Sequence, residues 1–360
     1  MNHIAAIQRQ LEEQGLDAVL ITDEKNQRYA CGFPFTDGYV LVTRKGALLV
    51  TDSRYIEAAQ KAAGSCAEVR LYDRQHPPLE QIKAALKEEN IGTLGAEEEK
   101  LSYSQYQAME IKLGRSLSPA QRIFKTLRAS KDADELVSMR RAQAISEAAL
   151  AETLQIIRPG MTEREAAAEL VYRMLRHGSE GNSFDPIVIT GRKTSMPHGV
   201  PGDEVIQPGD FITMDFGSLS DGYCSDMTRT VAVGSATDEM KNIYELVLKA
   251  QLTGIAAARS GIPGSEIDAA ARKVIADAGY GPYFGHGFGH SLGLDIHEHP
   301  CASPSEAQIM PEGAVVSAEP GIYLPGRFGV RIEDVMILHA DGAEVITKAP
   351  KNELIILQNS

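Results

Sequence analysis

Four carboxylates at the ends of apolar, strand-like runs are the strongest chemical signal in the sequence. Asp215 ends the run in FITMDFG, and Glu319 ends the run in AVVSAEPG. A second acidic residue follows each of them on another strand-like run, Asp226 in SDMTRTVAV and Glu333 in GVRIEDVMIL. A carboxylate buried alone costs free energy, so each of these residues needs a partner or a metal. One such residue would be interpreted as a hydrogen-bonded structural Asp, but four in a repeated pattern favour a metal site.

Histidines that could complete such a site crowd into one short segment, HGFGHSLGLDIHEH. It holds four of the 9 histidines, namely His286, His290, His297 and His299. Carboxylates combined with imidazole suit hard and borderline dications such as Mn²⁺, Co²⁺ or Zn²⁺. The helical zinc motif HE-x-x-H does not occur in this segment, because Pro300 follows His299 and argues against the helix that the motif requires.

Four carboxylates and one imidazole can form a shell for two metal ions. Two ions about 3.5–4 Å apart lower the pKa of a shared water molecule and make hydroxide near neutral pH. The same ions would polarise a carbonyl group. The chemistry expected of such a centre is hydrolysis of an amide.

The elements that must position these groups contain a faint internal repeat. In RPGMTEREAAA, Thr162 and Glu165 form a capping box, which predicts the start of a helix. In RSGIPGSEIDAAA, Ser265 and Asp268 stand at the same relative places. IQPGDFITMDFG and IMPEGAVVSAEPG match in the same way. The pattern predicts one βαα-type unit used twice, which would place the four carboxylates pairwise across a pseudo-two-fold axis.

The chain of 360 residues is long enough for two domains. Residues 1–125 mix strands and helices in an α/β pattern, with a strand at LDAVLIT and a hairpin that turns at residues 44–46. A basic segment over 126–132 is interpreted as a solvated linker rather than a nucleic-acid patch. A long helix begins at Ala133 and opens a second domain over residues 133–360.

Composition narrows the classes of function. Lys and Arg number 36 against 49 Asp and Glu, which gives a net charge of −13 and does not suit a nucleic-acid binder. No stretch reaches the roughly 18 uninterrupted apolar residues that a membrane helix needs. The four cysteines are scattered, and the N-terminal stretch does not have the apolar core of a signal peptide. We therefore expect a cytoplasmic protein.

Five motifs in order, PHGVPGD, MDFG…SDMTRT, GHSLGLDIHEHP, SAEPGIY and GVRIED, resemble the creatinase/methionine-aminopeptidase superfamily. The resemblance is greatest to the Xaa-Pro peptidases, prolidase and aminopeptidase P, and it spans essentially the whole chain. It implies an α+β fold: a pita-bread metallopeptidase catalytic domain with a pseudo-two-fold duplication, preceded by a smaller creatinase-like α/β domain. It also implies a homodimer, two divalent metal ions per subunit and proline-containing peptides as substrates, with a metal-bridging hydroxide as nucleophile.

The resemblance assigns metal ligands by motif position. By this resemblance, Asp215 corresponds to a terminal ligand of one metal, and Asp226 and Glu333 correspond to the bridging ligands. His290 and Glu319 are similar to ligands of the other metal. Glu319 is also implied to be the general base that takes the proton of the water.

The resemblance also assigns residues to the substrate. His198 and His297 correspond to histidines that bind substrate and stabilise the tetrahedral intermediate. His286, Tyr323 and Arg331 correspond to positions that line the site. We further expect three aromatic residues to form an apolar slot for proline: Phe284, Phe288 and Tyr323.

One departure from the family pattern bears on peptide length. Cys301 follows Pro300, where these peptidases commonly carry an Arg that can grip the free carboxylate of a dipeptide. We therefore expect tripeptides and longer chains to be cleaved at least as well as dipeptides. The native metal remains open among Mn²⁺, Co²⁺ and Zn²⁺, with Mn²⁺ and Co²⁺ preferred.

Three other functions are alternatives to a Xaa-Pro exopeptidase. A methionine aminopeptidase is disfavoured by the N-terminal domain of about 130 residues, since bacterial forms resemble the catalytic half alone. Metal-free hydrolysis of the creatinase type is disfavoured because all five ligand positions carry residues that can bind metal. A non-catalytic binding module on the same fold would have no reason to keep those five residues together.

Overall fold

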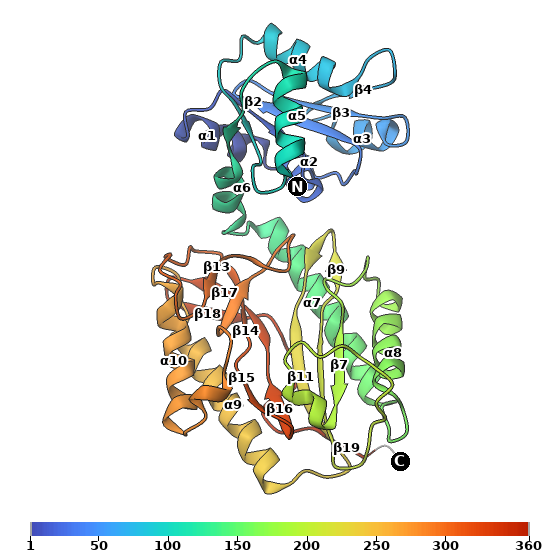
Figure 1. Cartoon of the computed structure of the whole chain (residues 1–360), viewed down its shortest axis with the longest axis vertical. Coiled ribbons are helices and arrows are strands. Elements are labelled where there is room, and N and C mark those ends of the chain that lie inside the picture. The colour runs from blue at the N-terminus through green and yellow to red at the C-terminus, as the bar shows by residue number, and fades with distance from the viewer. Residues whose placement is uncertain (1, 359–360) are drawn as a thin grey trace. The chain divides into compact units, whose positions relative to one another are not determined.

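A computed structural model describes residues 2–358, and the chain divides into two compact units, Met1–Arg128 and Ala129–Ser360 (Figure 1). The boundary falls inside the segment 126–132 that was expected as a linker. We call these the N-terminal unit and the C-terminal unit. No helix of the described residues combines the length and the apolar composition needed to cross a membrane.

The N-terminal unit is a mixed six-stranded sheet in the order β4-β3-β2-β1-β5-β6, with helices packed around it. The predicted strand and hairpin are confirmed, since β2 and β3 pair antiparallel. The strands are β1 (Ala18–Ile21), β2 (Gly38–Thr43), β3 (Ala47–Thr51), β4 (Glu68–Leu71), β5 (Leu94–Ala96) and β6 (Ser118–Pro119). The helices are α1 (Ile4–Glu13), α2 (Glu24–Cys31), α3 (Ile56–Ala63), α4 (Pro78–Glu88), α5 (Tyr103–Leu113) and α6 (Gln121–Arg128).

Helix α6 was not expected from the sequence, because the basic residues obscured its period. Ile123 and Phe124 are fully buried, whereas Arg122 and Lys125 are exposed. One face of a short amphipathic helix thus enters the core of the N-terminal unit. The first three residues of the expected linker are therefore helical.

The C-terminal unit is built from two copies of the same pattern, two helices followed by three antiparallel strands. The first copy contains α7 (Ala133–Leu154), α8 (Glu163–Arg176), β7 (Ile187–Thr190), β8 (Phe211–Phe216) and β11 (Met227–Val233). The second contains α9 (Asp238–Ala257), α10 (Gly264–Asp277), β12 (Gly289–Ser291), β14 (Val315–Ala318) and β17 (Asp334–His339). The unit that repeats is thus ααβββ, rather than the βαα-type unit read from the sequence.

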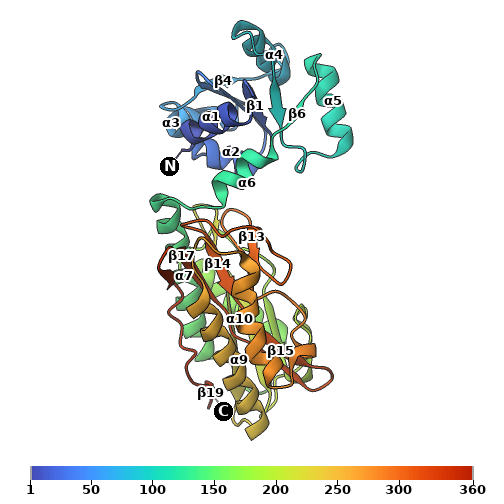
Figure 2. The ribbon, with the colours of Figure 1, turned by 90° about the vertical axis from the view of Figure 1, so that its left-hand side faces the viewer.

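Helix α7 packs against α8, and α9 packs against α10. Figure 1 shows α8 at one edge of the unit and α9 and α10 at the other, and Figure 2 turns α9 and α10 towards the viewer. The sheets run β19-β11-β8-β7 and β13-β12-β14-β17-β18, with two-stranded ribbons β9–β10 and β15–β16. The remaining elements are β9 (Leu219–Ser220), β10 (Tyr223–Cys224), β13 (Glu298–Ala302), β15 (Gly321–Leu324), β16 (Phe328–Arg331), β18 (Gly342–Val345), β19 (Ile356–Leu357) and the 3₁₀ turns Gly191–Ser195 and Gly281–Tyr283.

The two repeats begin their second helices differently. Thr162 caps α8 and forms the predicted capping box with Glu165. Helix α10 instead begins at Gly264 after Pro263, without a side-chain cap, so Ser265 does not repeat the role of Thr162. Asp268 is buried and forms an ion pair with Arg272 at 2.7 Å. The repeat thus conserves the element but not its cap.

Candidate metal centre

The register of the paired strands brings the two carboxylate pairs to corresponding places. In the first repeat β8 pairs antiparallel with β11, and Asp215 lies opposite Thr228, two residues after Asp226. In the second repeat β14 pairs antiparallel with β17, and Ala318 lies opposite Asp334, so Glu319 and Glu333 flank that pair. Each repeat therefore presents two carboxylates at one end of a strand pair.

His290, on β12, joins these carboxylates. Its Nε2 atom lies 3.5 Å from Oδ2 of Asp226 and 3.4 Å from Oε1 of Glu319. One ligand atom each of Asp226, His290 and Glu333 lies within 4.8 Å of the others. We call Asp215, Asp226, His290, Glu319 and Glu333 the five-residue cluster. All five are residues that the sequence predicted as metal ligands.

The cluster buries more negative charge than the neighbouring Arg331 balances. Burial raises the pKa of Asp226 well above its usual value, and the charges of Asp215 and Glu319 raise it further. Burial likewise raises the pKa of Glu333 well above its usual value, with a further contribution from Asp226. The Oδ1 atoms of Asp215 and Asp226 are buried without a hydrogen-bond partner among the described residues. Unpaired buried carboxylate oxygens that converge in this way fit a site for cations.

The imidazole of His290 is oriented for ligation. Its Nδ1 lies 3.2 Å from the carbonyl oxygen of Ser291, to which it donates, and this leaves the Nε2 lone pair facing the carboxylates. Burial lowers the pKa of His290, which favours the neutral form that binds metals. The hydroxyl of Ser317 accepts from the backbone N–H of His290 and donates to Glu319 at 3.0 Å.

A chain of hydrogen bonds leads from Asp215 away from the cluster. Arg331 donates to Oδ2 of Asp215 at 2.5 Å and to the hydroxyl of Tyr323 at 2.9 Å. That hydroxyl lies 2.9 Å from Nε2 of His286, whose Nδ1 faces the carbonyl oxygen of Gly287. Since Nδ1 then carries the imidazole proton, the tyrosine donates to Nε2. The three residues predicted to line the site thus form one connected network.

The two histidines predicted to bind substrate lie at the surface beside the cluster. The ring of His297 is 4.5 Å from that of His290, centroid to centroid. His198 is exposed and lines a pocket of about 440 Å³. The pocket also has His286 and Tyr323 in its wall, together with Ser195, Pro197, Pro282, Tyr283, Gly285 and Pro325.

Two of the three aromatic residues expected to form the proline slot lie in the core instead. Phe288 is fully buried in an apolar core cluster, and a methyl group on Gly254 would meet its ring. Phe284 is 2% exposed and belongs to a second core cluster. The rings of Phe284 and Phe288 fill space between helix and sheet. Of the three aromatics, only Tyr323 lines the pocket, and the exposed Tyr283 lies there as well.

Two hydroxyl residues of the site were missed by sequence reasoning. Thr228 donates to Glu333 at 2.6 Å and accepts from Nε of Arg331 at 3.0 Å. Ser317 plays the matching part in the second repeat, beside Glu319. Thr228 is two residues after Asp226, and Ser317 is two residues before Glu319. The period of two along a strand, which puts such residues on one face, was the signal that could have found both.

A buried arginine supports the site from behind. Arg229 is 1% exposed and donates to Oδ1 of Asp334 at 2.8 Å and to the backbone oxygen of Glu333 at 2.6 Å. Its position ties β11 to the start of β17. The backbone that presents Glu333 is therefore anchored across the two repeats.

The cluster fits a cation-binding site, and comparison with known proteins gives the family. The profile of metallopeptidase family M24 matches residues 137–340, and that of the creatinase/prolidase N-terminal domain matches residues 3–130. A Xaa-Pro dipeptidase from Pyrococcus horikoshii is 35% identical over 96% of this chain and 96% of its own length.

Solved structures agree over the full chain. The Xaa-Pro dipeptidase from Bacillus anthracis is 42% identical, with a TM-score of 0.94 over 98% of this chain and 99% of its own. The X-Pro aminopeptidase from Thermotoga maritima MSB8 is 36% identical, with a TM-score of 0.90 over 99% and 100%. The chain therefore belongs to metallopeptidase family M24. The predicted family and the predicted pita-bread fold with its creatinase-like N-terminal domain are confirmed, and the protein is a metal-dependent hydrolase.

Removal of metal should cost more stability at neutral than at acidic pH. In the metal-free protein, burial and mutual repulsion raise the pKa values of Asp226, Glu319 and Glu333. These carboxyl groups therefore stabilise the fold fully at a pH below their pKa in the unfolded chain, which is about 4. This contribution is lost as the pH rises through their higher pKa in the folded protein. Bound cations offset that loss, while protons compete with them in acid. We expect the difference in Tm between metal-loaded and chelated protein to grow from about pH 5.5 to about pH 8. A constant or shrinking difference would contradict a metal site in this cluster.

Replacement of Thr228 by Val should weaken metal binding while preserving the shape of the core. The variant loses the donor to Glu333 and leaves Nε of Arg331 unpaired. Loss of such an orienting contact usually lowers metal affinity by about 10–100-fold. Thr213→Val is a matched control on the neighbouring strand, because the Thr213 hydroxyl contacts that of Thr230, at 3.4 Å, and not a carboxylate of the cluster. Competition with a fluorescent chelator measures both affinities, and equal values in the two variants would refute the role of Thr228.

Proposed function

We propose that the protein hydrolyses the peptide bond between an N-terminal residue and a following proline, with two divalent metal ions held by the five-residue cluster. The observation that carries this proposal is the convergence of the buried Asp226 and Glu333 on His290. One oxygen each of Asp215 and Asp226 is also buried without a hydrogen-bond partner among the described residues. The relatives named as Xaa-Pro dipeptidase and X-Pro aminopeptidase support the specificity for proline.

Each residue of the cluster has a proposed role. Asp226 and Glu333 would be shared by both ions as bridging ligands, Asp215 would hold one ion as a terminal ligand, and His290 and Glu319 would hold the other. When bound, the two ions would activate a water molecule and polarise the scissile carbonyl. We favour Mn²⁺ or Co²⁺, with Zn²⁺ also suited to the ligand set.

Glu319 is the proposed general base. Burial raises the pKa of its carboxyl, which makes it a better proton acceptor than an ordinary exposed glutamate. Ser317 donates to Oε1 and holds that oxygen in place, so the other oxygen can take the proton from the attacking water. Glu319 would then pass the proton to the leaving nitrogen.

His297 and His198 are the proposed stabilisers of the tetrahedral intermediate. Burial, and the neighbouring His290, lower the pKa of His297, so its imidazole is neutral near pH 7 and can donate one N–H to an oxyanion. His198 lines the pocket together with His286 and Tyr323. Histidines on two sides of the scissile bond could orient an amide between them.

The pocket beside the cluster is the proposed position of the proline ring. A bond to proline is a tertiary amide without an N–H and with a restricted ring, so it must be recognised by shape. Pro197, Pro282, Tyr283 and Pro325 supply apolar walls, and His286 and Tyr323 supply polar groups. Arg331 donates a hydrogen bond to the hydroxyl of Tyr323, and its proposed role is to position that side chain.

A methionine aminopeptidase is the second enzyme to consider. The match of residues 3–130 to the creatinase/prolidase N-terminal domain argues against it. A non-catalytic module would not need a cluster whose carboxylates repel one another. We propose in addition that the enzyme works as a homodimer in the cytoplasm, where the four free cysteines would stay reduced.

Peptide assays test specificity and length together. We expect cleavage of a Xaa-Pro-Yaa tripeptide with a kcat/KM at least equal to that of the Xaa-Pro dipeptide, because Cys301 gives no charge to grip a carboxylate. Cleavage should require added Mn²⁺ or Co²⁺, and Xaa-Ala-Yaa is the control. Strong preference for the dipeptide would overturn the length argument, and equal cleavage of the alanine peptide would overturn the specificity for proline.

Three variants separate metal ligands from substrate-binding residues. Asp226→Asn or Glu333→Gln should abolish activity and lower metal content, because a neutral amide cannot bridge two dications as a carboxylate does. His297→Ala should keep the metal content and lose about a hundredfold in kcat, the usual scale for one stabiliser of an oxyanion. Metal analysis beside kinetics measures both. Full metal loading with normal turnover in Asp226→Asn, or metal loss in His297→Ala, would show the respective assignment to be wrong.

A further inference from the structure

A second group of ligating side chains lies on β13, outside the five-residue cluster. Strand β13 is the edge strand of the five-stranded sheet. Glu298, Pro300 and Ala302 are buried along it, whereas His299 is exposed and Cys301 is half-buried. The alternation of a strand therefore turns the imidazole and the thiol to the same outer face. Neither residue is among the proposed metal ligands of the five-residue cluster or the proposed stabilisers of the intermediate.

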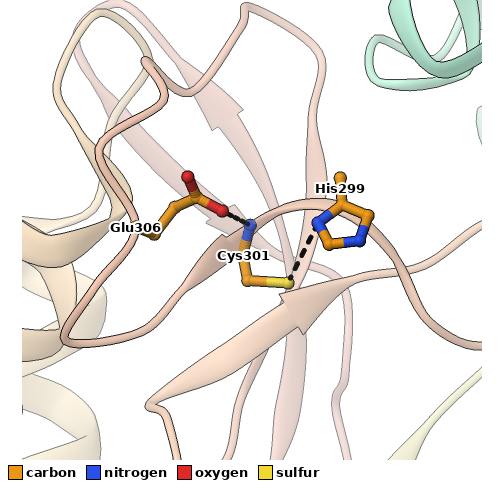
Figure 3. Close-up of side chains that lie close together, drawn as sticks. All are labelled: His299, Cys301 and Glu306. Atoms are coloured by element: carbon orange, nitrogen blue, oxygen red, sulfur yellow. Dashed lines mark hydrogen bonds between the residues drawn. The ribbon is translucent and has the colours of Figure 1, made fainter. Parts of the chain in front are cut away.

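Three different ligand types converge there, as Figure 3 shows. The Sγ atom of Cys301 lies 3.9 Å from Nδ1 of His299. Glu306 completes a group in which one ligand atom of each residue lies within 4.8 Å of the others. Two ligands of a tetrahedral zinc ion stand about 3.5 Å apart, given Zn–S of about 2.3 Å and Zn–N of about 2.0–2.1 Å. Bringing Sγ of Cys301 and Nδ1 of His299 to that distance needs a side-chain shift of only a few tenths of an ångström.

The backbone holds Glu306 towards this group. Its Oε2 accepts from the N–H of Cys301 at 3.2 Å, and its Oε1 accepts from that of Gln308 at 2.9 Å. Each carboxylate oxygen keeps a second lone pair free for a cation. The N–H of Ser265 also donates to the backbone oxygen of Glu306, so α10 fixes the loop. Such contacts orient a ligand before any metal arrives.

Close packing fixes the backbone of Cys301 as well. A Cβ atom on Gly264 would lie 1.9 Å from its carbonyl oxygen. Only a glycine at the start of α10 therefore lets the helix approach β13 this closely. The segments that carry Cys301 and Glu306 both rest on α10, and this gives the group a rigid base.

We propose that His299, Cys301 and Glu306 form a separate mononuclear site for a thiol-seeking dication of the Zn²⁺ class. The ion would displace the thiol proton to solvent and bind Sγ, Nδ1 and one carboxylate oxygen, with water in the fourth position. Sulfur separates this site chemically from the five-residue cluster, which offers oxygen and nitrogen ligands. The protein would then bind a third equivalent of metal.

Cobalt spectroscopy reports the two sites separately. A thiolate bound to Co²⁺ gives an intense near-ultraviolet charge-transfer band, whereas carboxylate and imidazole ligands do not. Titration of the chelated full-length protein with Co²⁺ should produce this band, and excess Zn²⁺ should remove it by displacement. The band should be lost in Cys301→Ser. In His299→Ala, an exposed substitution that leaves the fold intact, the affinity for Co²⁺ measured by the band should fall at least about tenfold. Cys66→Ser, at another half-buried cysteine, is the matched control and should keep the band.

The outcome is independent of the proposed peptidase function. Asp226→Asn removes a ligand of the five-residue cluster and should leave the thiolate band unchanged. The band with no Xaa-Pro cleavage would support this site and refute the proposed function, and cleavage with no band would do the reverse. Absence of the band at saturating Co²⁺ in the wild-type protein, or its survival in Cys301→Ser, would overturn the proposal.

Discussion

Mutual repulsion among buried carboxylates is the constraint on which the C-terminal unit depends. Asp226 and Glu333 are almost fully buried, and burial raises the pKa of both. The charges of Asp215 and Glu319 raise the pKa of Asp226 further, and the charge of Asp226 raises that of Glu333. Hydrophobic packing alone would push such groups towards water. The fold keeps them inside by fixing the backbone on both sides, as Arg229 does at Glu333. A site that is costly without cations is also one that binds cations strongly, because their charge removes the cost.

Duplication explains how one short pattern yields this arrangement. In each repeat the second and third strands pair antiparallel, which brings residues far apart in sequence to one end of the pair. Two such ends facing each other bring four carboxylates together without any long loop to carry them. The hydroxyls of Thr228 and Ser317 follow from the same geometry, since each lies two residues from a carboxylate on its strand.

Sequence reasoning succeeded where a residue type and a period agreed. The strand around Asp215, the helix at Ala133 and the capping box at Thr162 have local causes, and the structure contains all three. Sequence reasoning failed where tertiary packing decides which side chains are buried. Phe288 was expected beside substrate, yet a glycine on α9 makes room for its ring in the core. Hydrogen bonds between strands, such as that from Thr228 to Glu333, depend on register, which a single sequence does not display.

The pseudo-two-fold symmetry is broken at the residues that matter for chemistry. Asp215 of the first repeat is held by Arg331, a cation contributed by the second repeat. Its counterpart Glu319 is held by the neutral hydroxyl of Ser317 and faces the imidazole of His290. An ion beside Asp215 would share that carboxylate with a guanidinium, whereas an ion beside Glu319 would not. Under the proposed roles the two ions are therefore bound unequally. Among the described residues, Glu319 accepts a hydrogen bond from Ser317 and none from Arg331, and burial raises its pKa, so it is the carboxyl proposed to carry the proton.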